Sequence, residues 1–304
     1  MTREQMISRV VTALKKNDFH IATFFGSNTC FDLIAKNQNI TLAIKIYENI
    51  DSIRKEQGEE LKKLGQTINA TCLIIGEKTK VFNLKDDTVY NRYDIQTITS
   101  KAFEKVLDHE TLPSKYFKGK YIVDMDFNEL KRKREKLNIS LQELANRIGV
   151  ATDTMNRFER GSSTSLETAK KLEHELDENL VKEIDILGKH PHKKDFDDEP
   201  NERLLEKVHD IGLKMALFNH SPFKAIGSSD HNLFITTGKG KFDIPKKALE
   251  LKKASTVVNS DSIIVTTEYK YKNIDGVPVI EESDLETISK LKDLKKIIRE
   301  REQE

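Results

Sequence analysis

The sequence predicts two α/β domains on either side of a central all-α domain of four to five short helices. Three observations lead to this fold class. Helix-like and strand-like hydrophobic patterns alternate in residues 1–112 and again in residues 201–304. Residues 125–186 carry helical patterns only. Residues 187–200 are rich in charge and proline and have few aliphatic side chains, so we predict a linker there.

Composition limits the classes of protein to consider. The chain has 304 residues, and its 51 basic and 50 acidic residues give a net charge of +1, which excludes a uniformly basic histone-like binder. A local basic patch remains compatible with this balance. Hydrophobic residues make up 37% of the chain, below the roughly 45–50% of ordinary soluble domains, which favours several small domains over one large core.

Cysteine content and hydrophobic runs indicate the compartment. Cys30 and Cys72 lie in apolar runs without a C-x-x-C neighbour, so their number and spacing exclude a disulfide framework and a zinc site. The chain has no run of about 18 apolar residues that could span a membrane, and its amino terminus lacks a signal-peptide core. We expect a soluble cytoplasmic protein.

The first α/β domain, residues 1–112, has the predicted order α-β-β-β-α-β. An amphipathic helix places Met6, Val10, Val11 and Leu14 on one face. Three strands are expected next: HIATFF (20–25), CFDLIAK (30–36) and ITLAIKIY (40–47). A helix at 51–66 with Asp51 as N-cap follows, and then a buried strand TCLIIG. Residues 111–126, which include Pro113 and the run KYFKGKY, are predicted to be a connector.

The second α/β domain, residues 201–304, repeats this pattern. Residues 61–75 align without gaps with residues 251–265, and residues 31–34 align with residues 223–226 at nearly the same offset. We predict a diverged repeat of the first domain. The alternative is that two α/β domains share generic patterning by chance.

The central segment predicts four consecutive helices. The first covers 127–136, and Ser140 begins the second with a capping box to Glu143, in which each side chain bonds the other's backbone N–H. Gly149 ends the second helix. The third covers about 152–159 and the fourth 165–176.

The spacing of Ala145 and Gly149 is typical of a helix-turn-helix. The small residue lets the next helix approach, and the glycine allows a sharp turn between them. The pattern L-(x)3-R…S-(x)3-LA-(x)3-GV-(x)4-M-(x)2-FE-(x)-G closely resembles the DNA-binding domain of the xenobiotic-response-element (XRE) and phage-repressor family. The alternative is a helical module used only for protein contacts.

The resemblance implies roles for individual residues. Arg134 and Glu159 stand where the family has a buried ion pair. The recognition helix, 152–159, would lie in the major groove, with base contacts from Thr152, Asp153, Asn156 and Arg157. Stabilisation of the helix dipole is an equal alternative for Asp153.

A second set of residues is expected to contact phosphates, which sets register rather than base preference. A solvated helix surface is the alternative for the basic cluster at 131–134. The chain departs from the family at Ala151, where a polar N-cap is usual, and at Leu141, where Gln is usual. The predicted phosphate contacts are Gln142, Arg160, Ser162, Ser163, Thr164, Lys131 and Arg132.

The α-β-β-β-α-β order, with Asp32 and Lys45 on successive strands, is similar to the restriction-endonuclease-like fold. That site needs a second acid two residues before the lysine to hold Mg²⁺. Ala43 stands there, and Lys224 replaces Asp32 in the repeat. We therefore predict no catalytic residue, metal or cofactor, unless Glu4 or Glu48 supplies a ligand from another position.

The whole arrangement resembles a family of archaeal helix-turn-helix transcriptional regulators. This resemblance implies a sequence-specific regulator without enzymatic activity that binds double-stranded DNA as a homodimer and does not bind membranes. Two alternatives stay open: a DNA-processing nuclease targeted by the helix-turn-helix, and a protein-interaction or antitoxin-like module.

Overall fold

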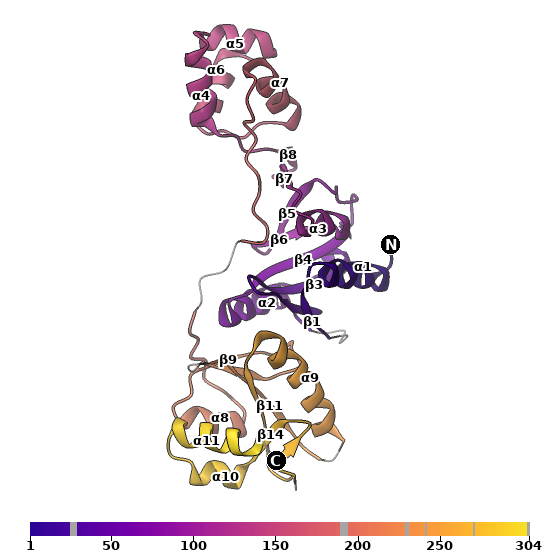
Figure 1. Cartoon of the computed structure of the whole chain (residues 1–304), viewed down its shortest axis with the longest axis vertical. Coiled ribbons are helices and arrows are strands. Elements are labelled where there is room, and N and C mark those ends of the chain that lie inside the picture. The colour runs from indigo at the N-terminus through magenta and orange to yellow at the C-terminus, as the bar shows by residue number, and fades with distance from the viewer. Residues whose placement is uncertain (25–28, 189–193, 229–230, 241, 270, 303–304) are drawn as a thin grey trace.

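Three bodies follow one another along the long axis of the molecule in the computed structural model (Figure 1). The helical module lies at one end, the N-terminal α/β domain in the middle and the C-terminal α/β domain at the other end. The structure describes residues 1–24, 29–188, 194–228, 231–240, 242–269 and 271–302.

The N-terminal domain is an eight-stranded sheet in the order β1-β2-β3-β4-β6-β5-β7-β8. Helices α1 and α3 cover one face, and α2 covers the other. The elements are α1 (Arg3–Lys16), β1 (His20–Thr23), β2 (Leu33–Lys36), β3 (Thr41–Asn49), the 3-10 helix η1 (Ile50–Ser52), α2 (Lys55–Ile68), β4 (Thr71–Lys78), β5 (Thr88–Arg92), β6 (Ile95–Ile98), α3 (Ser100–Leu107), β7 (Ser114–Phe117) and β8 (Lys120–Ile122).

Two local predictions for this domain are wrong. Asp51 does not cap the second helix, because it lies in η1, where its carboxylate accepts from the Lys80 N–H, and α2 begins only after Arg54. Residues 111–126 are not a bare connector, because the KYFKGKY run forms the β7–β8 hairpin. Strand β7 pairs with β5 in parallel and so extends the sheet.

The central module consists of α4 (Phe127–Lys136), α5 (Leu141–Ile148), α6 (Thr152–Glu159) and α7 (Leu166–Leu176). Its own apolar core includes Leu130, Leu144, Met155, Phe158 and Leu172.

The C-terminal domain is a six-stranded sheet in the order β13-β14-β12-β11-β10-β9. Helices α8, α10 and α11 share a core on one face, and α9 covers the other. The elements are α8 (Arg203–Asp210), β9 (Met215–Leu217), β10 (Ala225–Gly227), β11 (Leu233–Gly238), α9 (Asp243–Val258), β12 (Asp261–Thr266), β13 (Asn273–Ile274), β14 (Val277–Glu281), α10 (Glu282–Thr287) and α11 (Leu291–Glu302).

The two α/β domains have the same topology. Read from the other edge, the C-terminal order β9-β10-β11-β12-β14-β13 matches β1-β2-β3-β4-β6-β5. The central strands β3, β4 and β6 are parallel, as are β11, β12 and β14, and the remaining pairs of both series are antiparallel. Helices α2 and α9 both end at an asparagine in the left-handed region, Asn69 and Asn259.

The α2 face of one domain and the α9 face of the other share one hydrophobic core. At its centre the rings of Phe31 and Phe223 stack, with centroids 5.9 Å apart and an interplanar angle of 26°. Each makes an edge contact within its own domain, Phe31 with Phe24 at 5.1 Å and Phe223 with Phe218 at 5.3 Å. The interface is therefore built from corresponding residues of the two domains.

Backbone hydrogen bonds join the same two domains. The Glu60 carboxylate accepts from the N–H groups of Asn219 and His220 at 2.9 and 2.8 Å. The Cys30 N–H donates to the His220 carbonyl at 2.6 Å. These directional hydrogen bonds fix the relative orientation of the two α/β domains, which the apolar core alone would not specify.

The segment predicted as a linker is partly ordered. Ile186, placed with the helical module by the predicted boundaries, is buried in the core of the N-terminal domain. Phe196 packs partly buried against the core shared by the α/β domains, and Asp198 forms an ion pair with Lys63. Residues 189–193 lie outside the described residues. One aromatic ring and specific polar bonds order a segment whose composition predicts a loose chain.

Candidate nucleic-acid interface

Helix α6 is held against α5 by a close approach. Ala145 is fully buried, and its carbonyl accepts from the N–H groups of Gly149 and Val150 at 3.0 and 2.9 Å. Gly149 has φ of 77°, a left-handed conformation that closes the helix and that a side chain would disfavour. This turn directs α6 across α5, as a helix-turn-helix requires.

One face of α6 is anchored and the other is open. Met155 and Phe158 are buried in the core of the module. Thr152, Asp153 and Arg157 are exposed, and Asn156 is half-buried beside them. The Arg157 guanidinium donates to the Thr154 hydroxyl at 3.0 Å, and no ion pair to it occurs among the described residues. Ala151 provides no side-chain cap for α6.

A buried ion pair fixes the end of α6 to α4. Arg134 donates through Nε and Nη2 to the two carboxylate oxygens of Glu159, at 2.6 and 3.1 Å. Its Nη1 donates to the Ile139 carbonyl at 2.9 Å. The Glu159 carboxylate raises the pKa of Arg134. The bidentate geometry fixes position as well as charge.

The residues predicted to contact phosphates are not equally accessible. Gln142, Arg160 and Ser162 are exposed. The Ser163 hydroxyl donates to the Asp124 carboxylate at 2.6 Å, so it is already engaged. Thr164 is a wrong prediction, because it is buried and its backbone pairs with Val123 in both directions.

The other members of this set lie on α4. Lys131 and Arg132 are exposed, and the Arg132 Nε donates to Glu129 at 2.7 Å.

The capping box predicted at the start of α5 is only half formed. Ser140 accepts from the Glu143 N–H at 3.1 Å, but the Glu143 carboxylate instead accepts from Arg147 at 2.7 Å.

Two isolated β-bridges connect the helical module to the segment that follows β8. Val123 pairs with Thr164, and Met125 pairs with Val181, directly after β8. The Asp124 carboxylate bridges Lys115 of β7 and Ser163 of the α6–α7 loop. Burial alone would raise the pKa of Asp124, but the bonds from Lys115 and Ser163 outweigh it and lower that pKa.

The nuclease-like position of the N-terminal domain is filled by cations. The Asp32 Oδ1 atom accepts from Lys45 Nζ at 3.0 Å and from Arg3 Nη2 at 2.8 Å. The other carboxylate oxygen, Oδ2, accepts from the Ile46 N–H at 2.7 Å. Asp32 is fully buried, and Ala43 lies on β3 opposite Ile34. Composition and motif spacing did not point to Arg3, which was missed because its helix is far from Asp32 in sequence.

The corresponding position of the C-terminal domain has no such charges. Because Leu33 pairs with Ile44 and Ala225 pairs with Ile235, the counterparts of Asp32, Ala43 and Lys45 are Lys224, Phe234 and Thr236. Lys224 is exposed, whereas Phe234 is fully buried and contacts Phe223 edge-on at 4.9 Å.

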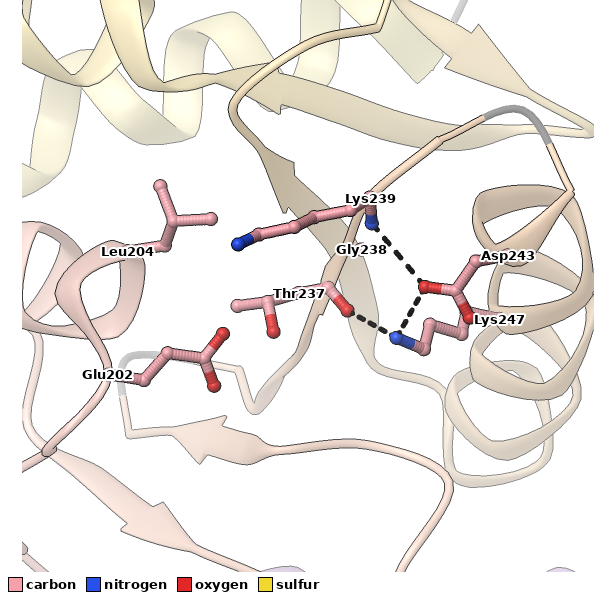
Figure 2. A pocket seen from close by; sticks show the side chains of 7 residues that line it. All are labelled: Glu202, Leu204, Thr237, Gly238, Lys239, Asp243 and Lys247. Atoms are coloured by element: carbon pink, nitrogen blue, oxygen red, sulfur yellow. Dashed lines mark hydrogen bonds and ion pairs between the residues drawn. The ribbon is translucent and has the colours of Figure 1, made fainter.

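A nearby pocket of about 250 Å³ lies at the end of β11 (Figure 2). On one side of the pocket, Lys247 donates to the Asp243 carboxylate at 2.7 Å and to the Thr237 carbonyl at 2.8 Å. The same carboxylate occupies the amino end of α9 and accepts from the Lys239 N–H at 3.4 Å.

No helix in the described part of the chain is long and apolar enough to cross a bilayer. No group of three or more His, Cys, Asp or Glu side chains in that part is arranged to hold a metal ion. Glu48, considered as a migrated ligand, instead pairs with Lys78 at 2.6 Å.

Two segments of the chain match known domain families. Residues 3–113 match the PD-(D/E)XK superfamily domain, and residues 130–182 match a helix-turn-helix domain. These matches confirm the predicted fold class, which combines a nuclease-like α/β domain with a helix-turn-helix module. No solved structure matches the chain.

The chain is similar over nearly its full length to archaeal proteins named "Putative HTH-type transcriptional regulatory protein". The Pyrococcus horikoshii protein is 31% identical over 99% of this chain and 98% of its own length. The Methanocaldococcus jannaschii protein is 30% identical over 97% and 95%. The Archaeoglobus fulgidus protein is 28% identical over 97% of both chains.

Proposed function

This chain belongs to the family of archaeal HTH-type transcriptional regulatory proteins, and we propose that it regulates transcription by binding double-stranded DNA through α6. The observation that carries the proposal is the two-sided character of α6. Met155 and Phe158 anchor it, while Thr152, Asp153 and Arg157 face outward. Such an arrangement offers side chains to base edges from a helix that cannot rotate.

Arg157 is the residue we assign to base recognition most directly. A guanidinium without an acidic partner can donate to O6 and N7 of guanine as a planar pair of bonds. Asp153 could accept from the amino group of cytosine, and Thr152 and Asn156 flank them on the same helix. Gln142, Arg160, Ser162, Lys131 and Arg132 would fix the register through phosphates.

The test begins with selection of duplexes from a random library by the full-length protein. On the selected duplex, Arg157→Ala should weaken binding by about 1–3 kcal/mol and relax the preference at one base pair. Arg299→Ala removes the same kind of charge from exposed α11 and should change nothing. Equal loss on selected and random duplexes would restrict Arg157 to phosphate contact, and no enrichment at all would reject sequence-specific binding.

We propose further that neither α/β domain is an enzyme. A Mg²⁺ site needs oxygen ligands that are free to bind the metal. Both oxygens of Asp32 already accept hydrogen bonds, from Lys45, Arg3 and the Ile46 N–H. The second acid is absent because Ala43 stands in its place. The arginine and lysine thus neutralise the carboxylate that a metal would otherwise balance.

The shared topology supports the interpretation that the two α/β domains arose by duplication. Their pairing then resembles a dimer contained within one chain, with Phe31 and Phe223 at its centre. A homodimer of whole chains, which we propose for binding paired half-sites, would have to use another surface. Sedimentation of the protein with and without the selected duplex tests this; one chain per duplex would contradict it.

A further inference from the structure

The β7–β8 hairpin has a surface that the proposed function does not explain. It carries the sequence KYFKGKY at residues 115–121. Phe117 is 54% exposed, and Lys118 in the turn and Lys120 directly after it are also exposed. Lys118 and Gly119 both have positive φ, 47° and 81°, so the turn is a tight two-residue loop that holds these side chains apart from the sheet.

The hairpin rests on a rigid aromatic layer. Tyr116 packs against Phe82, Tyr90 and Tyr121 with centroids 5.1–5.5 Å apart. Lys85 lies over the Tyr121 ring at 3.8 Å. Rings packed in this way hold the hairpin in one orientation, so its lysines occupy defined positions rather than a mobile loop.

The charge of the tip is unbalanced. Lys115 is neutralised by Asp124. Within the described residues, no ion pair involves Lys118 or Lys120, and the Lys118 ammonium lies 5.2 Å from the Phe117 ring centroid. In a chain of net charge +1, an ordered tip with two unpaired cations is a local basic surface, and a polyanion is its complement.

The hairpin is directly connected to the end of α6. Strand β8 continues into Val123, which pairs with Thr164 in both directions at 2.8 and 3.0 Å. Asp124 joins Lys115 of the hairpin to Ser163 of the loop that follows α6. The hairpin lies between the α/β body and the helical module (Figure 1). Its position relative to α6 is therefore fixed by backbone pairing and by side-chain bonds.

We propose that the β7–β8 hairpin is a second DNA-contacting element, which binds the phosphate backbone beside the site read by α6 through Lys118 and Lys120. Phe117 directly precedes Lys118 in the sequence and would add an apolar contact to the sugar edge. This inference rests on the proposed function, because it extends the interface of α6 along the same duplex. It also gives the KYFKGKY run a role other than connection.

The experiment measures the salt dependence of binding of the full-length protein to its selected duplex. Each phosphate contact contributes about 0.9 to the slope of log affinity against log salt, so Lys118→Ala/Lys120→Ala should lower the slope by about 2. Affinity should fall equally on selected and random duplexes, since phosphate contacts carry no base preference. Lys290→Ala/Lys292→Ala removes two exposed lysines of the same spacing in the C-terminal domain and should leave the slope unchanged.

Duplex length provides a second measurement. Trimming the base pairs that flank the selected site should weaken binding of the wild-type protein but not of Lys118→Ala/Lys120→Ala. A wild-type slope and length dependence in this variant, while Arg157→Ala still loses affinity, would overturn the hairpin proposal and leave α6 as the reader. Absence of DNA binding by the wild-type protein would instead reject the proposed function itself.

Discussion

The two α/β domains share a strand order but carry different residues at the nuclease-like position. In the N-terminal domain, Asp32 and Lys45 remain as a fully buried ion pair joined by Arg3. In the C-terminal domain, Lys224 points to solvent, and Phe234 fills the space opposite β10 with a ring packed on Phe223. The same backbone thus carries a buried polar cluster in one domain and an apolar one in the other.

This difference shows that the fold does not depend on the chemistry of the site. Both sheets are held by apolar residues on their two faces, and the faces that carry α2 and α9 merge into one core. Once a carboxylate is buried, however, it must keep its cations, because an uncompensated buried charge is costly. The N-terminal cluster is therefore a structural feature, whereas packed aromatic rings lie at the corresponding place in the C-terminal domain.

The shared core gives the largest expected effect. Phe31→Ala and Phe223→Ala should each lower the free energy of unfolding by about 3–5 kcal/mol, since both rings are fully buried. Because the rings stack, the double variant should lose less than the sum of the two. Urea denaturation followed by circular dichroism measures all three. Exposed Phe117→Ala is the control, and strictly additive losses would show that the two domains are stabilised independently.

Corresponding positions of the two domains should respond very unequally to loss of charge. Asp32→Ala strands the Lys45 ammonium, which is 2% exposed, and should cost about 3–5 kcal/mol in unfolding free energy. Lys224→Ala removes an exposed side chain and should change it by less than about 0.5 kcal/mol. The same denaturation experiment compares them. Similar losses in both variants would mean that the buried ion pair contributes no more to the unfolding free energy than an exposed lysine does.

The helix ends should respond alike. Asn69 and Asn259 end α2 and α9 with φ of 53° and 58°. Replacing either by Ala puts an unfavourable residue into the left-handed region and should cost about 1–2 kcal/mol. Asn69→Gly and Asn259→Gly are the matched controls and should cost much less, since glycine adopts this conformation freely. A loss in only one domain would argue that the two helix ends are not equivalent.

Divalent metal should have no effect. With Asp32 bonded to Arg3 and Lys45 and no acid at Ala43, addition of Mg²⁺ or Mn²⁺ should neither release heat in calorimetry nor produce cleavage of single-stranded, duplex or branched DNA. Cleavage by the wild-type protein that Lys45→Ala abolishes would contradict the proposal that the α/β domains are inactive.

Local pattern was sufficient for the central helices and for the N-terminal elements from α1 to β4, but it did not predict β5, β6 and α3, which follow them. The central helices begin and end where caps, glycines and apolar spacing predicted, and β4 lies over the predicted run TCLIIG. Errors occurred where a local signal had a competing partner elsewhere. Asp51 resembled an N-cap, but its carboxylate accepts from the Lys80 N–H. Glu143 was expected to complete a capping box, but its carboxylate accepts from Arg147 instead.

The sequence by itself determined the order of the elements from α1 to β4, the helix-turn-helix and the missing second acid, because these depend on residues close together in the chain. Only the tertiary structure decided that Arg3 neutralises Asp32, that Phe31 meets Phe223, and that the hairpin at 114–122 is tied to the end of α6. Contacts between distant segments depend on the geometry of whole sheets and on which apolar faces find each other. Hydrophobic periodicity specifies that a face is buried, but not which partner covers it.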